Sequence, residues 1–148
     1  MLTNESLTID EMEQVLRDRG VRITGPRREI WKLFQNSPHG MTITEAVEAV
    51  QEKRIGLATV YRTVEVLERI GLLRRVHNSQ GDHLFVTSRP GHYHPLVCRS
   101  CGKVLEFETC DLQELEQRLA EASGFKVEGH ELEVYGTCPE CQARRNGQ

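Results

Sequence analysis

The chain has 148 residues, 38% of them hydrophobic and 28% charged, a composition that excludes a disordered or membrane-spanning protein and fits one domain or two small ones. The N-terminal residues show no basic and apolar signal segment, so we expect a cytoplasmic protein. The net charge of −3 argues weakly against nucleic-acid binding, but it is the sum of +1 over residues 1–89 (13 basic, 12 acidic) and −4 over residues 90–148 (6 basic, 10 acidic).

The first 89 residues predict helices followed by a hairpin. Apolar periodicity and capping signals predict helices over residues 6–19, from 25 onward, from 42 onward and over 58–70. Strands are predicted at 72–77 and 83–87, on either side of a turn at 78–82. Helices followed by a hairpin in so short a stretch are typical of a winged helix-turn-helix domain. The alternative is any other small α+β domain.

The second stretch predicts strands at 94–97, 103–107 and 130–135 and a helix over 111–123. We therefore expect an α+β protein, with a winged-helix domain at 1–88, a linker at 89–91 and a small α/β domain at 92–148. A unit of under about 60 residues buries a marginal core and commonly needs a metal or a partner subunit.

Two Cys-x-x-Cys pairs, Cys98/Cys101 and Cys138/Cys141, carry the strongest chemical signal. Each pair can present two thiolates to one tetrahedral Zn²⁺ ion. The alternatives are a redox dithiol and unrelated thiols, but no thioredoxin-like unit is predicted around either pair. A closed Cys₄ site has no open position, so we expect structural Zn²⁺ and not catalysis. The fifth cysteine, Cys110, has no assigned role.

Histidines precede both cysteine pairs: His92 and His94 before the first, His130 before the second. On an extended segment, residues i and i+2 point to the same side, and zinc at the cysteines would draw the two preceding segments together. We expect these histidines to bind a second divalent metal, with Glu106 as a further ligand and His83 as a weaker candidate. The other acidic candidates are Glu108, Asp111 and Glu114. Ordinary surface histidines are the alternative.

The helix predicted over 58–70 carries Thr59, Tyr61 and Arg62 in its first turns. The N-terminal part of a recognition helix enters the major groove, where arginine bonds guanine with two hydrogen bonds. Arg22 and Arg27 can contact phosphates or the minor groove. The alternative is a solvated helix face. Further basic candidates are Arg28, Lys53 and Arg54.

In combination and order, the segments at 56–62, 92–107 and 130–141 resemble the ferric uptake regulator (Fur) family over about residues 10–142. The resemblance implies a metal-dependent transcriptional repressor that acts as a homodimer on a palindromic operator in double-stranded DNA. It implies neither a membrane nor a small-molecule substrate. The winged helix would bind DNA, and the C-terminal domain would dimerise and sense metal.

By position, the resemblance assigns base contacts to Tyr61 and Arg62 and a minor-groove contact to Arg22. It assigns structural zinc to the four paired cysteines and the regulatory metal to the first and last of the three histidines. The middle one, His94, stands where many members have an acid or a histidine. Glu106 matches an acidic position that some members use between the two domains.

The chain departs from the family pattern at several positions. Tyr93 and Pro95 interrupt a run that is all histidine in many members, and Gln113 replaces an expected glutamate next to Glu114. These changes leave the sensed metal open: three imidazoles favour Zn²⁺ or Fe²⁺, with Mn²⁺ and Ni²⁺ as further candidates.

Three other functions stay open at this point. A peroxide-sensing repressor of the same family is one. A zinc enzyme with an open histidine site is the second, although the chain has no HExxH motif. The third is a zinc-stabilised dimerisation adaptor without DNA contact.

Overall fold

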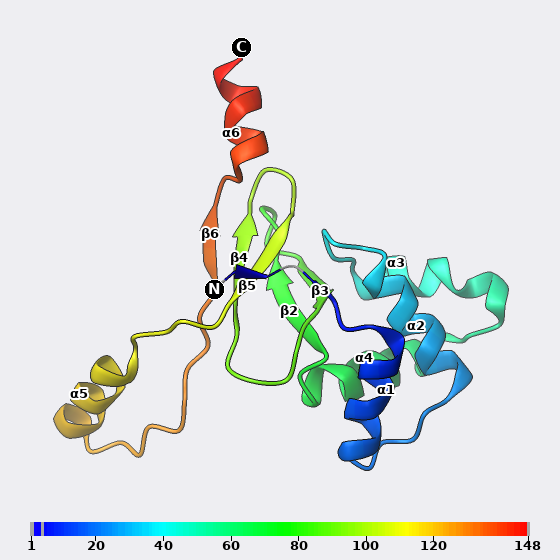
Figure 1. The fold of residues 1–148 in the computed structure, drawn as a ribbon, viewed down its shortest axis with the longest axis horizontal. Helices are drawn as coiled ribbons and strands as arrows, with labels where there is room; N and C mark the ends of the chain where they lie inside the picture. Colours follow the sequence, from blue (N-terminus) through cyan, green and yellow to red (C-terminus); the bar gives the residue numbers. More distant parts are fainter. Residues whose placement is uncertain (1, 4, 148) are drawn as a thin grey trace.

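The computed structural model describes residues 2–3 and 5–147 and combines helices with two small sheets (Figure 1). The first half holds α1 (Ile9–Asp18), α2 (Gly25–Gln35), α3 (Ile43–Ala49), a 3₁₀ turn (Gln51–Lys53), α4 (Leu57–Arg69) and the hairpin strands β2 (Leu73–His77) and β3 (His83–Thr87). The predicted α+β fold with helices followed by a hairpin is confirmed. We call the β2–β3 hairpin the wing.

Threonine caps set where the helices begin. The Thr8 side chain accepts a hydrogen bond from the Glu11 backbone, and the Glu11 side chain accepts one from the Thr8 backbone. This capping box begins α1 at Ile9, three residues later than predicted, because the apolar residue Leu7 lies before the cap. Thr42 caps α3 in the same way.

One hydrophobic core holds the helices together. Trp31 and Phe34 of α2 are fully buried against α1, α4 and the wing. On α4, Val64 and Leu67 face this core, whereas Tyr61 and Arg62 are exposed. The outer face of α4 is thus held on a rigid support while its side chains remain free for contacts.

The second sheet has the strand order β1-β5-β4-β6. Its strands are β1 (Leu2–Thr3), β4 (His94–Cys98), β5 (Val104–Phe107) and β6 (Val134–Gly136). β4 and β6 are parallel, and the other pairs are antiparallel. The sequence analysis did not predict β1. It predicted a strand over 130–135, whereas β6 has three residues and begins at Val134.

A small cluster of valines joins the wing to this sheet. Val76 and Val86 of the wing pack with Val97 of β4 and Val104 of β5. Strand β1, at the start of the chain, pairs with β5. The second half therefore shares its small core with the first half, and the boundary at 89–91 remains a prediction.

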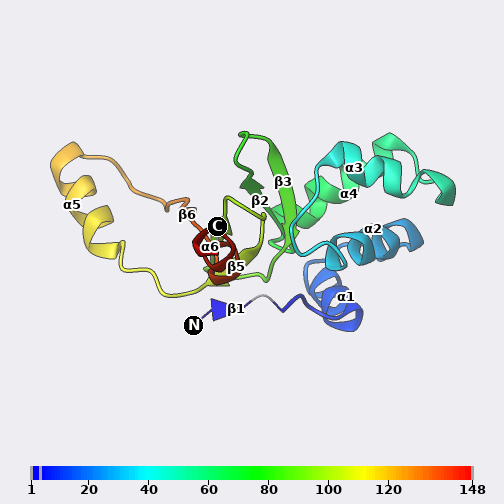
Figure 2. The ribbon, with the colours of Figure 1, turned by 90° about the horizontal axis from the view of Figure 1, so that it is seen from above.

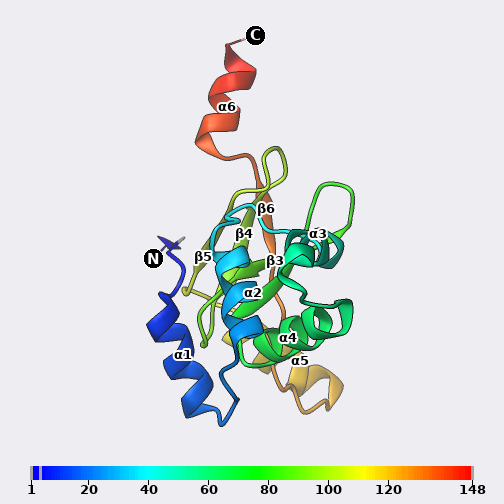
Figure 3. The same cartoon turned by 90° about the vertical axis from the view of Figure 1, so that its right-hand side faces the viewer.

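Two helices project from the second half. Figures 1 and 2 show α5 (Gln113–Ser123) at one side, at the end of two extended segments, and Figure 3 shows α6 (Pro139–Asn146) leading away from the sheet. α6 was not predicted. No side chain of α5 is buried, and Leu115, Leu119 and Phe125 are 42%, 52% and 75% exposed. Of the described helices, none is long and apolar enough to cross a membrane.

Candidate metal centres and nucleic-acid interface

The parallel pairing of β4 and β6 brings the two cysteine pairs together. Cys98, the last residue of β4, lies opposite Gly136, the last residue of β6. The backbone N–H of Arg99 donates to the Gly136 carbonyl at 2.9 Å. Strands β4 and β6 thus end at the same edge of the sheet, and each leads into its Cys-x-x-Cys pair within two residues.

The four thiols form a compact group. The sulfur atoms of Cys98, Cys101, Cys138 and Cys141 all lie within 4.8 Å of one another, and those of Cys101 and Cys138 are 3.8 Å apart. Tetrahedral zinc with Zn–S bonds of about 2.3 Å places two sulfurs about 3.8 Å apart. The donor set and its spacing therefore fit Zn²⁺.

The second cysteine pair opens helix α6, with Cys138 at the N-cap and Pro139 in the first turn. A Cys-x-x-Cys pair at a helix start is also the arrangement of redox dithiols. Here, however, each pair lies against the other, and a metal site accounts for all four thiols where a dithiol accounts for two. None of the five cysteines forms a disulfide.

The backbone around Cys98 favours the ionised thiol. Burial acts to raise the pKa of Cys98, but backbone N–H donors of Cys138, Cys101 and Ser100 outweigh it and lower the pKa to about 6. The Cys138 N–H lies 3.3 Å from the Cys98 sulfur. Since the thiolate is the form that binds metal, the folded backbone favours metal binding at Cys98. At Cys101 a backbone hydrogen bond from Lys103 acts to lower the pKa, but burial and the neighbouring thiols outweigh it and raise the pKa to about 12, so a metal ion must displace that proton.

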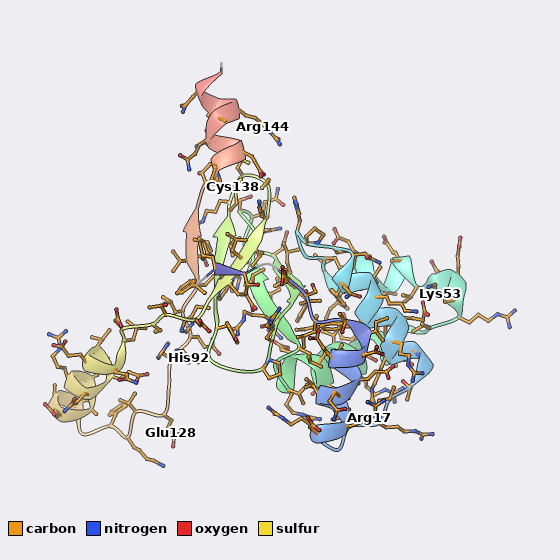
Figure 4. All side chains as sticks on the ribbon, in the orientation of Figure 1. Arg17, Lys53, His92, Glu128, Cys138 and Arg144 are labelled. Carbon is orange, nitrogen blue, oxygen red and sulfur yellow. The ribbon has the colours of Figure 1, made fainter. Side chains whose placement is uncertain are left out.

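A second cluster lies at the opposite end of the same strand pair. Figure 4 shows His92 and Cys138 at opposite ends of the sheet. The Nε2 atom of His94 lies 3.0 Å from Nε2 of His92 and 3.2 Å from Nε2 of His130. The sulfur of Cys110 lies 3.2 Å from the same His130 atom. These four donor atoms are all within 4.8 Å of one another.

Neighbouring groups orient the His130 ring and favour the neutral form of His94, the form that binds metal. The Nδ1 atom of His130 lies 2.7 Å from a carboxylate oxygen of Glu116 on α5. A carboxylate oriented on the outer nitrogen of a histidine is the usual support of a metal ligand. Burial lowers the pKa of His94, and the His92 and His130 rings act in the same direction. Lowering the pKa favours the neutral imidazole, which binds metal.

Two predicted ligands lie elsewhere. Glu106 is buried and accepts hydrogen bonds from the Ser88 hydroxyl and from Arg74 of the wing. His83 packs edge-on against His77 in the wing, with ring centroids 4.7 Å apart. Among the described residues, the histidine cluster is completed by Cys110 and not by a carboxylate.

The segment that carries His130 also contacts the wing. Glu133 accepts a hydrogen bond from the His77 backbone N–H at 2.9 Å, and its other oxygen lies 3.0 Å from Nδ1 of His77. An open groove of about 710 Å³ lies between this segment and β2. Sequence reasoning missed Cys110, Glu116 and Glu133, since none of them belongs to a local motif.

The predicted DNA-contacting residues surround the start of α4. Thr59 is half-buried, and Tyr61 and Arg62 are exposed. Gly56 caps the helix without a side-chain bond, which leaves backbone N–H groups open to phosphate oxygens. Within the described residues, Arg62 makes no ion pair with an acidic side chain. These features are compatible with a recognition helix.

Three other basic candidates, Arg22, Arg27 and Arg28, lie in the loop between α1 and α2 and in the first turn of α2. Arg22 is exposed, and the Arg27 guanidinium donates to the Arg22 carbonyl, which fixes the shape of this loop. Arg28 pairs with Glu13. Arg22 is thus available to a partner, whereas Arg28 serves to join α1 and α2.

Comparison with known proteins agrees with this arrangement. The sequence model of the ferric uptake regulator family matches residues 18–135. A ferric uptake regulation protein of Legionella pneumophila is 39% identical over 136 residues, which cover 89% of this chain and 99% of that protein. A peroxide operon regulator of Bacillus subtilis (strain 168) is 34% identical over 140 residues, which cover 93% of this chain and 96% of that protein.

Solved structures share the fold. The crystal structure of holo XcZur is 29% identical, with a TM-score of 0.76 over 91% of this chain and 96% of that one. A zinc uptake regulator complexed with zinc and DNA has a TM-score of 0.78 over 93% of this chain and 95% of that one. It is 22% identical, so this likeness concerns the fold alone.

Replacing one sulfur ligand, as in Cys141→Ser, is expected to release the tightly held zinc and loosen the second half. A structural zinc site contributes directly to folding free energy. In the variant, hydrogen exchange in β4, β5 and β6 should be at least about tenfold faster than in the unmodified protein. Exchange in α2 and α4 should change much less. Trp31, the single tryptophan, is buried in the first core, so its fluorescence reports on that half separately.

Elemental analysis after mild chelation measures the zinc content of each variant. Cys110→Ser is the matched control, because it removes a thiol outside the Cys₄ group and should keep one zinc per chain. Unchanged zinc content and unchanged exchange in Cys141→Ser would contradict the assignment.

Proposed function

The chain belongs to the ferric uptake regulator family and is thus a metal-responsive DNA-binding regulator and not an enzyme; we propose that it represses transcription when a regulatory metal binds the histidine cluster. As a homodimer it would bind a palindromic operator in double-stranded DNA. The Cys₄ group would hold structural Zn²⁺ throughout. We place the protein in the cytoplasm, where an operator is accessible.

The observation that carries the proposal is the shared segment between the histidine cluster and the wing. His130 and Glu133 lie three residues apart, and Glu133 bonds both the backbone and the ring of His77. A divalent ion at the cluster would supply a fixed link between His130 and the start of β4. A shift of His130 displaces Glu133, and Glu133 then changes the position of the wing and its helices.

The DNA-reading surface follows from the α4 geometry. We assign base contacts to Tyr61 and Arg62, supported by their exposure on a helix whose other face is buried. Thr59, Arg22 and Arg27 would contact phosphates or the minor groove. Two copies related by a two-fold axis present two such helices, which is why a palindromic site is expected.

Family membership leaves the signal open, because the relatives include both ferric uptake regulators and a peroxide operon regulator. The ligand set must decide between them. In this chain it is rich in imidazole and lacks a carboxylate among the described ligand atoms. This composition favours Zn²⁺ over Mn²⁺.

Metal loading of the histidine cluster is expected to strengthen operator binding by about 5- to 150-fold, the usual range for coupled sites. The probe is a labelled duplex selected from a random pool by the metal-loaded protein. Fluorescence anisotropy measures its affinity with and without Zn²⁺, after mild chelation that leaves the Cys₄ zinc in place. Reciprocity requires that the duplex raise the metal affinity by the same factor.

Glu133→Ala provides the control for this linkage. It leaves all proposed metal ligands intact but removes both bonds to His77. Metal affinity should stay near that of the unmodified protein, while the coupling factor falls. Equal operator affinity in the metal-loaded and chelated unmodified protein would overturn the switch.

Arg62→Ala is expected to weaken operator binding by about 1–3 kcal/mol and to relax specificity at one base pair of each half-site. Arg69→Ala is the matched control, since Arg69 is also an exposed arginine on α4 but lies in its last turn. Both substitutions leave the buried face of α4 untouched. Equal losses in the two variants would show that Arg62 contributes only general charge.

Leu119→Glu is expected to weaken the homodimer roughly 30-fold or more, because loss of an apolar anchor at an interface costs about 2 kcal/mol or more. Leu119 is 52% exposed on a helix with no buried side chain of its own. Gln117→Glu introduces the same charge on the opposite face and is the control. Sedimentation equilibrium measures both, and an unchanged dimer in Leu119→Glu would exclude α5 from the interface.

A further inference from the structure

Cys110 lies in the segment between β5 and α5 and reaches the histidine cluster from a third direction. His92 and His94 come from the start of β4, and His130 comes from the segment before β6. The Cys110 sulfur is half-buried, in no disulfide, and 3.2 Å from Nε2 of His130. All four donor atoms lie within 4.8 Å of one another.

Hydrogen bonding leaves electron pairs facing each other inside this cluster. Glu116 accepts at Nδ1 of His130, since a carboxylate has no proton to donate. In the neutral ring, Nε2 of His130 then carries a lone pair, directed at His94 and Cys110, each 3.2 Å away. In the metal-free protein the Cys110 thiol can donate to this lone pair, and a bound cation can take the place of that proton.

The spacing of the donors suits a four-coordinate ion. With Zn–N bonds of about 2.0–2.1 Å, tetrahedral ligands place two nitrogens about 3.3 Å apart. The two measured Nε2–Nε2 distances are 3.0 and 3.2 Å. Glu106, the carboxylate expected here, is instead held by Ser88 and Arg74.

We propose that the Cys110 thiolate is the fourth ligand of the regulatory metal and makes this a His₃Cys site selective for Zn²⁺ over Fe²⁺ and Mn²⁺. The inference rests on the proposed function and deepens it by naming the metal class. A soft thiolate favours zinc, whereas carboxylate ligands suit manganese. Formation of the metal–thiolate bond releases the thiol proton to solvent.

Cobalt(II) tests the ligand directly, because a cobalt–thiolate bond adds a charge-transfer absorption that imidazole ligands lack. The full-length protein carries Zn²⁺ in the Cys₄ site, verified as one zinc per chain, and is titrated with Co²⁺. One equivalent should bind with a thiolate band. Cys110→Ser should lose this band and keep its zinc. A missing band in the unmodified protein, or a band that persists in Cys110→Ser, overturns the proposal.

Selectivity is measured with a second variant, Cys110→Asp, which replaces sulfur by a carboxylate. The ratio of Zn²⁺ to Mn²⁺ affinity, from competition titrations, should fall by about tenfold or more relative to the unmodified protein. An unchanged ratio contradicts a thiolate ligand.

The unmodified protein supplies a measurement that needs no variant. Zn²⁺ at the histidine cluster should slow alkylation of Cys110 by iodoacetamide about tenfold or more, because a metal-bound thiolate is no longer a free nucleophile. Mass spectrometry reads Cys110 separately from the four zinc-held cysteines. An equal alkylation rate with and without the added metal overturns the proposal.

The DNA-binding assay separates this inference from the proposed function. If the cobalt–thiolate band depends on Cys110 but metal leaves operator affinity unchanged, the ligand assignment stands and the switch fails. If metal strengthens operator binding while the cobalt spectrum is the same in Cys110→Ser, the switch stands and the ligand assignment fails.

Discussion

The parallel pairing of β4 with β6 is the constraint on which the second half depends. It aligns Leu96 with Val134 and Cys98 with Gly136. At one end of these two strands the polypeptide continues into the Cys-x-x-Cys pairs. At the other end, the segments that lead into the strands carry the histidines. One register therefore builds both the Cys₄ group and the histidine cluster. A shift by one residue would separate the sulfurs at one end and the imidazoles at the other.

The same pairing explains why the second half is coupled to the first. Val97 and Val104 have only a small apolar cluster of their own, which the wing completes through Val76 and Val86. Polar contacts add to it: Glu133 bonds the wing at His77, and the His39 ring lies 2.7 Å from the Cys101 carbonyl. Because the sheet has so small a hydrophobic core of its own, its position depends on contacts with the wing. The proposed switch requires such a dependence.

The sequence predicts the strongly periodic elements and the local motifs of this fold. The amphipathic helices, the wing and the Cys-x-x-Cys pairs all have short-range signatures. β1, β6 and α6 do not: β1 has two residues, β6 has three exposed ones, and α6 is polar nearly throughout. Tertiary pairing explains β1 and β6, and α6 begins at Pro139, directly after Cys138.

Cys110 was missed for a related reason. Its closest partner, His130, is 20 residues away, and the chain between them leaves the sheet, forms α5 and returns. No spacing rule covers such an excursion. The sequence offers nearby carboxylates as further ligands, whereas in the structure Glu106 is hydrogen-bonded by Ser88 and Arg74. The contact of Glu116 with the His130 ring could not be predicted either, because it forms only when the chain after α5 brings His130 back to that helix.

Burial and backbone contacts suit the two clusters to the two roles that we propose for them, permanent zinc at the cysteines and an exchanging metal at the histidines. Cys98 and Cys141 are buried, and backbone N–H groups favour the Cys98 thiolate. Exchange of an ion there requires opening the ends of β4 and β6. The histidine cluster has one exposed ligand, His92, and lies beside an open groove. An ion bound there could exchange without unfolding the sheet, as the proposed coupling to the wing requires.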